Sequence, residues 1–277
     1  MLNPIFLSHG SPMLPFEDHE ARAFLRSLGQ DKNPQAILMV SAHWETDIPA
    51  VNAVARNSTI HDFHGFPPEL YRLRYDAPGS LELADWVREL LETAGFPITI
   101  DRERGLDHGA WAPLLLAWPE ADIPVVQLSV QPDAGPEHHF RLGCALQPLV
   151  NEGVLIIGSG SFTHDLSSWR THRGQPEPDW VRDFAEWMDK TIAEGRTPDL
   201  LAYREKAPNA ARNHPTEEHL LPLFVALGAA GEGASSKRLH SSVAHSVLRM
   251  DAYELGGSLD REHSSSSPVE EVAARQR

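Results

Sequence analysis

Three histidines, His9, His43 and His164, each stand just past a short apolar run in a chain that contains 15 histidines. Neutral imidazole binds Zn, Fe, Cu and Ni in proteins, and it also carries protons near neutral pH. A single histidine in such a place is most simply a structural residue. Three imidazoles crowded at one edge of a fold would repel one another when protonated, which favours a bound metal or a proton relay.

The elements that must position these histidines are short strands. Residues 4–8, 36–42 and 154–157 are almost continuous apolar runs, typical of strands buried on both faces in a parallel sheet. In an open α/β sheet, ligands bind outside the carboxyl ends of the strands. Helical patterns alternate with the strands, most clearly from Ser80, a good N-cap, to Ala94. This alternation predicts an α/β fold with a single domain, a three-layer sandwich around a mostly parallel central sheet.

Other segments continue the alternation. Residues 105–111 form an expected loop before a helix over Pro113–Trp118. Thr216 is the expected N-cap of a further helix, which would place His219 about one turn in. We expect the other helices and strands at these positions: helices over 17–29, 136–151, 178–194 and 198–206, and strands over 50–54, 98–100, 123–130 and, as one or two closing strands, 238–255.

Residues 1–256 carry the periodic patterns and form the expected folded, functional domain. Residues 257–277 are rich in Ser, Glu and Arg and lack apolar periodicity. A segment of this composition cannot bury enough apolar surface to fold by itself. We therefore expect a disordered C-terminal tail.

Composition argues against several classes of protein. The formal net charge of −15 argues against a nucleic-acid partner, because phosphate binding needs clustered Lys and Arg. No stretch approaches the roughly 18 apolar residues of a membrane span, and the N-terminus has no signal-peptide pattern. The single cysteine, Cys144, allows no internal disulfide and fits a cytoplasmic location. We interpret Cys144 as a buried bystander.

Common catalytic signatures are missing from the sequence. There is no His-Glu-x-x-His zinc motif, no Cys pair and no phosphate loop ending in Gly-Lys-Ser/Thr. Gly158-Ser-Gly-Ser161 follows a strand, but it lacks the third glycine of a dinucleotide fingerprint and the Gly-x-Ser-x-Gly of a hydrolase elbow. Two further candidates remain: His108, which follows Asp107, and His219, which follows Glu218.

Six short blocks, each containing histidine, occur along the chain. They are His9-Gly-Ser-Pro-Met13, Ser41-Ala-His-Trp44, His61-Asp-Phe-His-Gly-Phe-Pro67, Asp107-His-Gly-Ala-Trp111, Gly158-Ser-Gly-Ser-Phe-Thr-His164 and Pro215-Thr-Glu-Glu-His-Leu-Leu-Pro222. In this order they resemble the successive blocks of the DODA-type (class III, LigB-like) extradiol aromatic ring-opening dioxygenases, over residues 4 to about 255. The resemblance implies a non-haem metal enzyme that opens the ring of a catechol with O2.

The resemblance also implies roles for individual residues. His9, His43 and His219 match metal ligands, with Glu218 as the alternative third ligand. Because neighbours on a helix point about 100° apart, only one of Glu218 and His219 is expected to face the metal. His164 matches an acid/base histidine beside the metal, recorded in some relatives as a fourth ligand.

The remaining expectations concern the substrate side of the site. His108 matches a histidine that contacts substrate or oxygen. The implied cofactor is one Fe(II) or Zn(II) ion per chain, and the implied partners are a small-molecule catechol and O2. Trp44 and Trp111 could wall a flat aromatic ring or only pack the sheet edge. Glu45 or Asp107 could orient an imidazole.

Two other functions fit the same residues. Three histidines with an open coordination position also activate water, so a zinc-dependent hydrolase is one alternative. A non-catalytic metal-binding protein that has kept the site is the other. The sequence identifies neither the catechol nor the oligomeric state.

Overall fold

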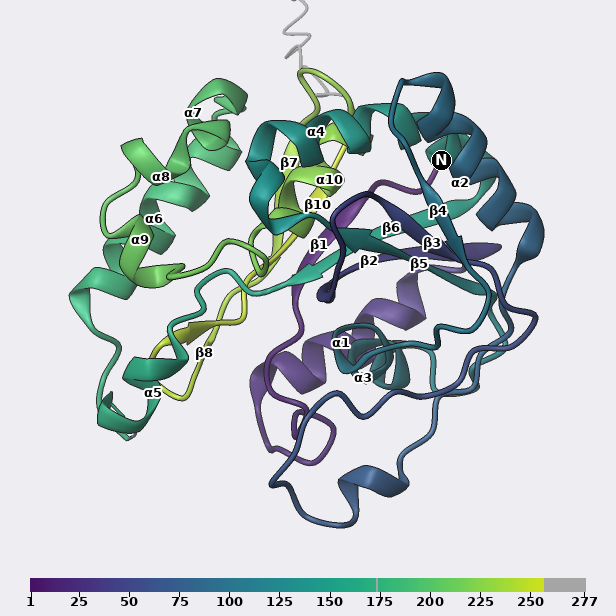
Figure 1. The fold of residues 1–277 in the computed structure, drawn as a ribbon. Coiled ribbons are helices and arrows are strands. Elements are labelled where there is room, and N and C mark those ends of the chain that lie inside the picture. Colours follow the sequence, from purple (N-terminus) through teal and green to yellow (C-terminus); the bar gives the residue numbers. More distant parts are fainter. Residues whose placement is uncertain (173, 257–277) are drawn as a thin grey trace, which may run out of the picture.

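The computed structural model describes residues 1–172 and 174–256, which form an α/β sandwich around one large sheet (Figure 1). The sheet has eight strands in the order β4-β3-β5-β2-β6-β1-β10-β7, and β8 pairs with β9 in a separate hairpin. The strands are β1 Ile5–Ser8, β2 Ala36–Glu45, β3 Ala50–Asn52, β4 Thr99–Asp101, β5 Val125–Val130, β6 Val154–Gly160, β7 Ser236–His240, β8 Val243–Ala244, β9 Leu248–Arg249 and β10 Ala252–Leu255.

The centre of the sheet is parallel. Strands β5, β2, β6 and β1 pair in parallel, whereas β10 and β7 extend the sheet antiparallel and β3 pairs antiparallel with β5. Side chains of β2 alternate between the two faces: Ile37 and Met39 pack on one face, Leu38 and Val40 on the other. This burial on both faces explains the continuous apolar runs. The predicted α/β fold with a mostly parallel central sheet is confirmed.

Strand register brings the histidine-bearing ends together. Ser8 of β1 pairs with Gly160 of β6, and Ser41 of β2 pairs with Ser159 of β6. Because the three strands are parallel, their carboxyl ends meet at one edge of the sheet. His9 and the end of β2 therefore lie beside the segment that leads to His164.

Helices cover both faces of the sheet (Figure 1). One layer contains α2 (Leu81–Thr93), α4 (Gly135–Leu146) and α10 (Leu221–Ala230), and the other contains α1 (Glu20–Asp31) and α3 (His108–Ala117). α4 and α10 pack backbone to backbone: a Cβ at Gly143 would lie 2.1 Å from Val225 O, and one at Gly228 would lie 2.0 Å from Phe140 O.

The remaining helices lie at the side of the sheet that ends in β10 and β7 (Figure 1). α6 contacts these strands directly, because Asp189 accepts a hydrogen bond from Tyr253 at 2.9 Å and pairs with Arg238 at 3.0 Å. The helices of this group and the 3-10 turns are α5 Leu166–His172, α6 Asp179–Ala193, α7 Thr197–Leu201, α8 Tyr203–Lys206, α9 Ala210–Asn213, η1 Leu70–Arg72, η2 Pro132–Ala134 and η3 Gln147–Glu152.

Three local predictions were wrong. α3 begins at His108 rather than Pro113, because the Asp107 side chain accepts from Ala110 N and caps the helix there. α10 begins at Leu221, so Thr216 is not its N-cap and His219 lies in the turn before the helix. Cys144 is exposed rather than buried.

Within residues 1–172 and 174–256, no helix is long and apolar enough to cross a membrane. The predicted disordered tail, 257–277, lies outside the described residues.

Candidate metal centre

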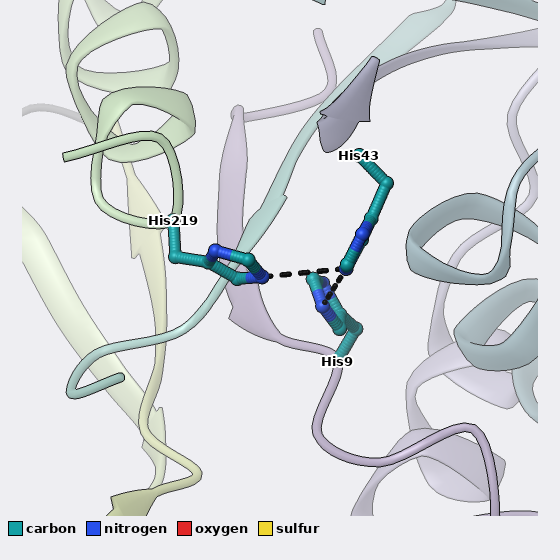
Figure 2. A group of neighbouring side chains, drawn as sticks. All are labelled: His9, His43 and His219. Carbon is teal, nitrogen blue, oxygen red and sulfur yellow. Dashed lines mark hydrogen bonds between the residues drawn. The ribbon is translucent and has the colours of Figure 1, made fainter. Parts of the chain in front are cut away.

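Three imidazoles converge at the carboxyl edge of the sheet (Figure 2). His43 Nε2 lies 3.0 Å from His9 Nε2 and 3.3 Å from His219 Nε2. His9 directly follows β1, His43 lies near the end of β2, and His219 comes from the turn before α10. Residues separated by up to 210 positions therefore present the same ring nitrogen to one point.

Two glycines allow this close approach. A Cβ on Gly160, at the end of β6, would lie 2.0 Å from the carbonyl oxygen of His219. That carbonyl accepts a hydrogen bond from Ser161 N at 2.8 Å, which ties the His219 turn to β6. A Cβ on Gly109 would lie 3.0 Å from His43 Cδ2. Larger residues at either position would displace the histidines.

The hydrogen bonds of His9 assign its tautomer. Ser159 Oγ donates its one proton to the carbonyl oxygen of Gly109, at 2.5 Å. Ser159 Oγ also lies 3.1 Å from His9 Nδ1. Because its own proton is already used, it accepts a hydrogen bond from the Nδ1–H of His9. In neutral imidazole the other nitrogen then has no proton. The Nε2 of His9 is therefore a bare lone pair facing the centre.

Neighbouring carboxylates indicate the tautomers of the other two histidines, His43 and His219. His219 Nδ1 donates to Glu218 Oε1 at 2.7 Å, and His43 Nδ1 lies 3.5 Å from Asp62 Oδ2. An ionised carboxylate only accepts, so Nδ1 of His219 carries the proton and its Nε2 is bare. The nearby charge of Asp62 favours the same tautomer for His43. A carboxylate behind an imidazole is the usual support of a metal-binding histidine.

A metal ion fits these three nitrogens. Bare lone pairs cannot hydrogen-bond to one another, so their approach needs a cation between them. A metal bound at about 2.1 Å, with angles between about 90° and 109°, separates its ligand nitrogens by about 3.0–3.4 Å. The observed 3.0 and 3.3 Å separations lie in this range. The donor set of imidazoles suits Fe, Zn, Cu or Ni rather than Mg or Ca.

Burial keeps these imidazoles neutral. Together with the neighbouring His108 it lowers the pKa of His43 to about 4, although Asp107 and Asp62 act in the opposite direction. Burial and the surrounding imidazoles hold the pKa of His9 and of His219 well below the ordinary value. Neutral imidazole is the form that binds metal, so the centre is in its binding form at neutral pH.

His108 is held beside the three histidines by Asp62. Asp62 Oδ1 accepts from His108 N at 2.9 Å, and Oδ2 lies 2.8 Å from His108 Nδ1. Although burial raises the pKa of Asp62, the hydrogen bonds from His108 lower it to about 2. The ring of His108 lies 3.9 Å from that of His43, between centroids. One ionised carboxylate thus supports two imidazoles of the site.

His164 lies on the opposite side, stacked on His219. The ring centroids are 3.4 Å apart with an interplanar angle of 15°, and His164 Nδ1 lies 3.9 Å from Glu218 Oε1. Burial lowers the pKa of His164 to about 4, although Glu218 acts to raise it. Glu218 is thus a partner of two imidazoles. Among the described residues, the groups able to hold a metal are His9–His43–His219, His43–Asp62–His108 and His164–Glu218–His219, and Glu218 belongs only to the last.

A cavity of about 250 Å³ opens next to the centre. Its inner end is formed by the five histidines His9, His43, His108, His164 and His219. The other walls are mainly apolar. They contain Phe63, Phe66, Leu166, Trp169 and Leu248. The site therefore places several imidazoles beside a space suited to an aromatic ring.

Other residues considered from the sequence lie elsewhere. Trp44 packs against Arg104, whose guanidinium carbon lies 4.7 Å from the ring centre, and Trp111 is buried with Nε1 donating to Ile60 O at 2.8 Å. Neither tryptophan lines the cavity. Asp107 accepts from Ser41 Oγ at 2.6 Å and pairs with Arg104 at 3.0 Å. The carboxylates that hold imidazoles are Asp62 and Glu218.

Sequence reasoning missed several contributors. Ser159, the partner of His9, lies within a block noted for its glycines, and Asp62 lies within the aromatic loop. Both are polar residues within a histidine-containing block, and this position is the signal that could have identified them. Trp169 and His245, which line the cavity, follow no motif and are placed only by the fold.

The fold and the site together define a class: α/β proteins with a histidine-rich centre at the carboxyl edge of the sheet and an aromatic-walled cavity beside it. Residues 3–253 match the model of the catalytic LigB subunit of aromatic ring-opening dioxygenase. The chain belongs to this family and is an extradiol ring-cleaving dioxygenase.

Named relatives agree with this family. The chain is 46% identical over 254 residues to a 4,5-DOPA dioxygenase extradiol of Beta vulgaris, covering 90% of this chain and 94% of that one. A protein of the same name from Escherichia coli (strain K12) is 40% identical over 230 residues, covering 81% and 84%. The crystal structure of an uncharacterized protein from Escherichia coli K12 superposes with a TM-score of 0.77 at 32% identity, covering 92% and 100%.

Proposed function

We propose that this protein opens the ring of a catechol with O2, using one Fe(II) ion held by His9, His43 and His219. The observation that carries the proposal is the convergence of three bare Nε2 atoms beside a cavity with aromatic walls. The relatives named as 4,5-DOPA dioxygenases support a catechol substrate. A catechol whose ring carries a side chain is therefore the proposed substrate class.

Three protein ligands on one side of an ion leave positions for the two catechol oxygens and for O2. Iron is proposed over zinc because Fe(II) bound here would supply Lewis acidity to the catechol and an electron to O2, and zinc supplies only the first. Glu218 is proposed to orient the ring of His219 rather than to act as a ligand, because its Oε1 already accepts the Nδ1 proton of that histidine.

His164 is proposed to accept a proton from a catechol hydroxyl. With its pKa near 4, the ring is neutral at working pH and has a free nitrogen. Once protonated, it lies 3.9 Å from Glu218 Oε1, and this negative charge stabilises the imidazolium. The same ring can return the proton later in the reaction.

His108 is proposed to contact substrate or oxygen on the other side of the centre. The Nδ1–H of His108 donates a hydrogen bond to Asp62, so Nε2 of His108 is a hydrogen-bond acceptor of fixed position. The walls formed by Phe63, Phe66 and Trp169 would hold the flat ring and exclude water. No observation favours the zinc-hydrolase alternative over this assignment. The cytoplasmic location and the absence of a nucleic-acid partner stay predictions.

The test is anaerobic loading with Fe(II), followed by addition of O2 and a panel of catechols. We expect O2 uptake and a yellow ring-opened product in equal amounts, and neither with zinc-loaded protein. Ester or amide turnover by the zinc form without O2 uptake would instead support the hydrolase. Tight metal binding with no product in either assay would indicate a non-catalytic metal-binding protein.

A further inference from the structure

The described lining of the cavity contains one ionisable residue besides the five histidines, His245. Among the described residues that line the cavity there is no Lys, Arg, Asp or Glu. The remaining lining is apolar apart from Ser11, Ser161 and the indole Nε1 of Trp169, none of which carries a charge. His245 is thus the residue of this lining, besides the five histidines, that can meet a charged group on a ligand.

His245 has a strained backbone conformation. It lies at the tip of the β8–β9 hairpin, where Ala244 pairs with Leu248. His245 has φ 51° and Ser246 has φ 67°. Gly, Asn and Asp favour such left-handed turn positions, and other residues lose on the order of 1 kcal/mol there. A strained backbone that places a side chain in a cavity wall points to a function for that side chain.

Two neighbours hold the imidazole. Glu17 Oε1 lies 3.6 Å from His245 Nε2, and Glu17 does not line the cavity. The ring of Trp169 meets His245 edge-on, with centroids 5.3 Å apart. Protonated imidazole donates from both nitrogens, so the nitrogen farther from Glu17 is available for an anion.

The hairpin is fixed relative to the metal centre. Thr163, which precedes His164, donates from Oγ1 to Val247 O and accepts from Arg249 N, both at 2.8 Å. Ser246 Oγ donates to Gln175 O at 2.7 Å. His245 therefore keeps a constant position with respect to the end of the cavity where the catechol hydroxyls would bind.

We propose that His245 is a specificity-determining residue that selects catechols whose ring side chain carries a carboxylate. The proposal rests on the proposed function, in that it assumes that the diol binds at the five histidines. The aromatic walls hold the ring, and His245 binds the carboxylate on the side chain. The proposed metal ligands and the proposed proton-transfer histidine are other residues of the lining, so His245 affects substrate choice rather than the chemical step.

The test compares two ligands of similar size, 3-(3,4-dihydroxyphenyl)propionate and 4-propylcatechol, with the iron-loaded enzyme. The variant is His245→Asn, because Asn adopts the left-handed turn. A charge-assisted hydrogen bond accounts for a factor of about ten or more in binding. We expect kcat/KM for the propionate to fall about tenfold, mainly through KM, with little change for propylcatechol.

Ser246→Gly is the control for the turn itself, since it relaxes the neighbouring left-handed position and removes the hydrogen bond to Gln175 O but keeps the imidazole in the cavity wall. It should leave both substrates unchanged. An equal fall for both substrates, no fall for either, or the same selective loss in Ser246→Gly would overturn the proposal.

Binding separates this proposal from the proposed function. If the iron-loaded wild type opens neither catechol, the proposed function fails, and calorimetry under anaerobic conditions still reports on His245. Tighter binding of the propionate, lost in His245→Asn, would support the role of His245. Equal affinity for the two ligands would rule it out.

Discussion

At the inner end of the cavity, His9, His43 and His108 are supported by residues far away in the sequence, and His219 by its neighbour Glu218. The rim, by contrast, is the part of the lining formed by the β8–β9 hairpin and the short helix α5, with His245, Leu248, Leu166 and Trp169. His9 is held by Ser159 of β6, and His108 by Asp62 of the aromatic loop. At the rim, His245 contacts Glu17 at 3.6 Å. Chemistry that needs fixed atoms is thus placed on the sheet edge, and substrate choice is left to elements that can change without disturbing it.

The comparison predicts that substitutions at the inner end reduce metal binding and activity, and that substitutions at the rim reduce substrate selectivity.

Removing one ligand has the largest expected effect. His43→Ala should abolish metal binding and turnover while leaving the circular dichroism spectrum unchanged, because the strand β2 remains buried. Metal content is measured by mass spectrometry after iron loading. His64→Ala, an exposed histidine of the neighbouring loop, is the control. A His43→Ala protein that retains its metal would remove His43 from the centre.

Gly160→Ala tests whether close backbone packing positions the centre. The new Cβ would meet the His219 carbonyl oxygen at 2.0 Å, so the turn must shift. Overpacking of this kind costs on the order of 3 kcal/mol. We expect lower metal occupancy and a lower free energy of unfolding in urea. Gly174→Ala cannot serve as the control for the unfolding measurement, because Gly174 has a φ of 75° and any side chain there strains the backbone. Unchanged metal affinity would show that the turn adapts.

Asp62→Asn should have a smaller effect that reaches both His43 and His108. Loss of a carboxylate behind a metal-binding histidine typically weakens metal affinity or activity by about 10–100-fold. We expect weaker iron binding together with a lower kcat, measured by competition with a chelator and by steady-state kinetics. Asp62→Glu, which keeps the charge, should restore part of both. A change in kcat alone would confine the role of Asp62 to His108.

Asp251→Asn should alter pH-dependent stability without changing metal content, because the buried carboxyl lies outside the cavity lining. Burial raises the pKa of Asp251 to about 6, above the value of about 3.9 in an unfolded chain. The folded state therefore holds this proton more tightly. That stabilisation is complete below about pH 4 and is lost as the pH rises to about 6, a change of about 3 kcal/mol.

Because Asn does not titrate, the Asp251→Asn variant does not lose stability at this position as the pH rises. Its free energy of unfolding relative to the wild type should therefore rise between about pH 4 and pH 6 in urea titrations. A constant difference across this range would show that Asp251 titrates normally in the folded protein. Reduced metal content would show that Asp251, whose backbone oxygen accepts from Ser8 N at 3.2 Å, also supports the neighbouring His9.

Much of this architecture follows from local patterns in the sequence. The apolar runs before His9 and His43 predict buried strands, because a strand covered on both faces must be apolar throughout. The ends of these strands then predict where a ligand binds. The apolar run 154–157 leads to His164 in the same way, and the family resemblance adds the roles of His164, His108 and His219. Capping was less predictable: Asp107 starts α3 five residues earlier than the apolar pattern indicates, and Pro222 marks the start of α10 in place of Thr216.

Only the tertiary structure decided which atoms meet. The register of β6 against β1 and β2 places Ser159 beside His9, and the loop over α3 brings Asp62 to both His43 and His108. These are contacts between residues far apart in sequence, and no local periodicity encodes them. The same holds for His245, which reaches the cavity because its hairpin is bonded to Thr163. The sequence determined the strands and the donor types, and long-range packing determined the centre.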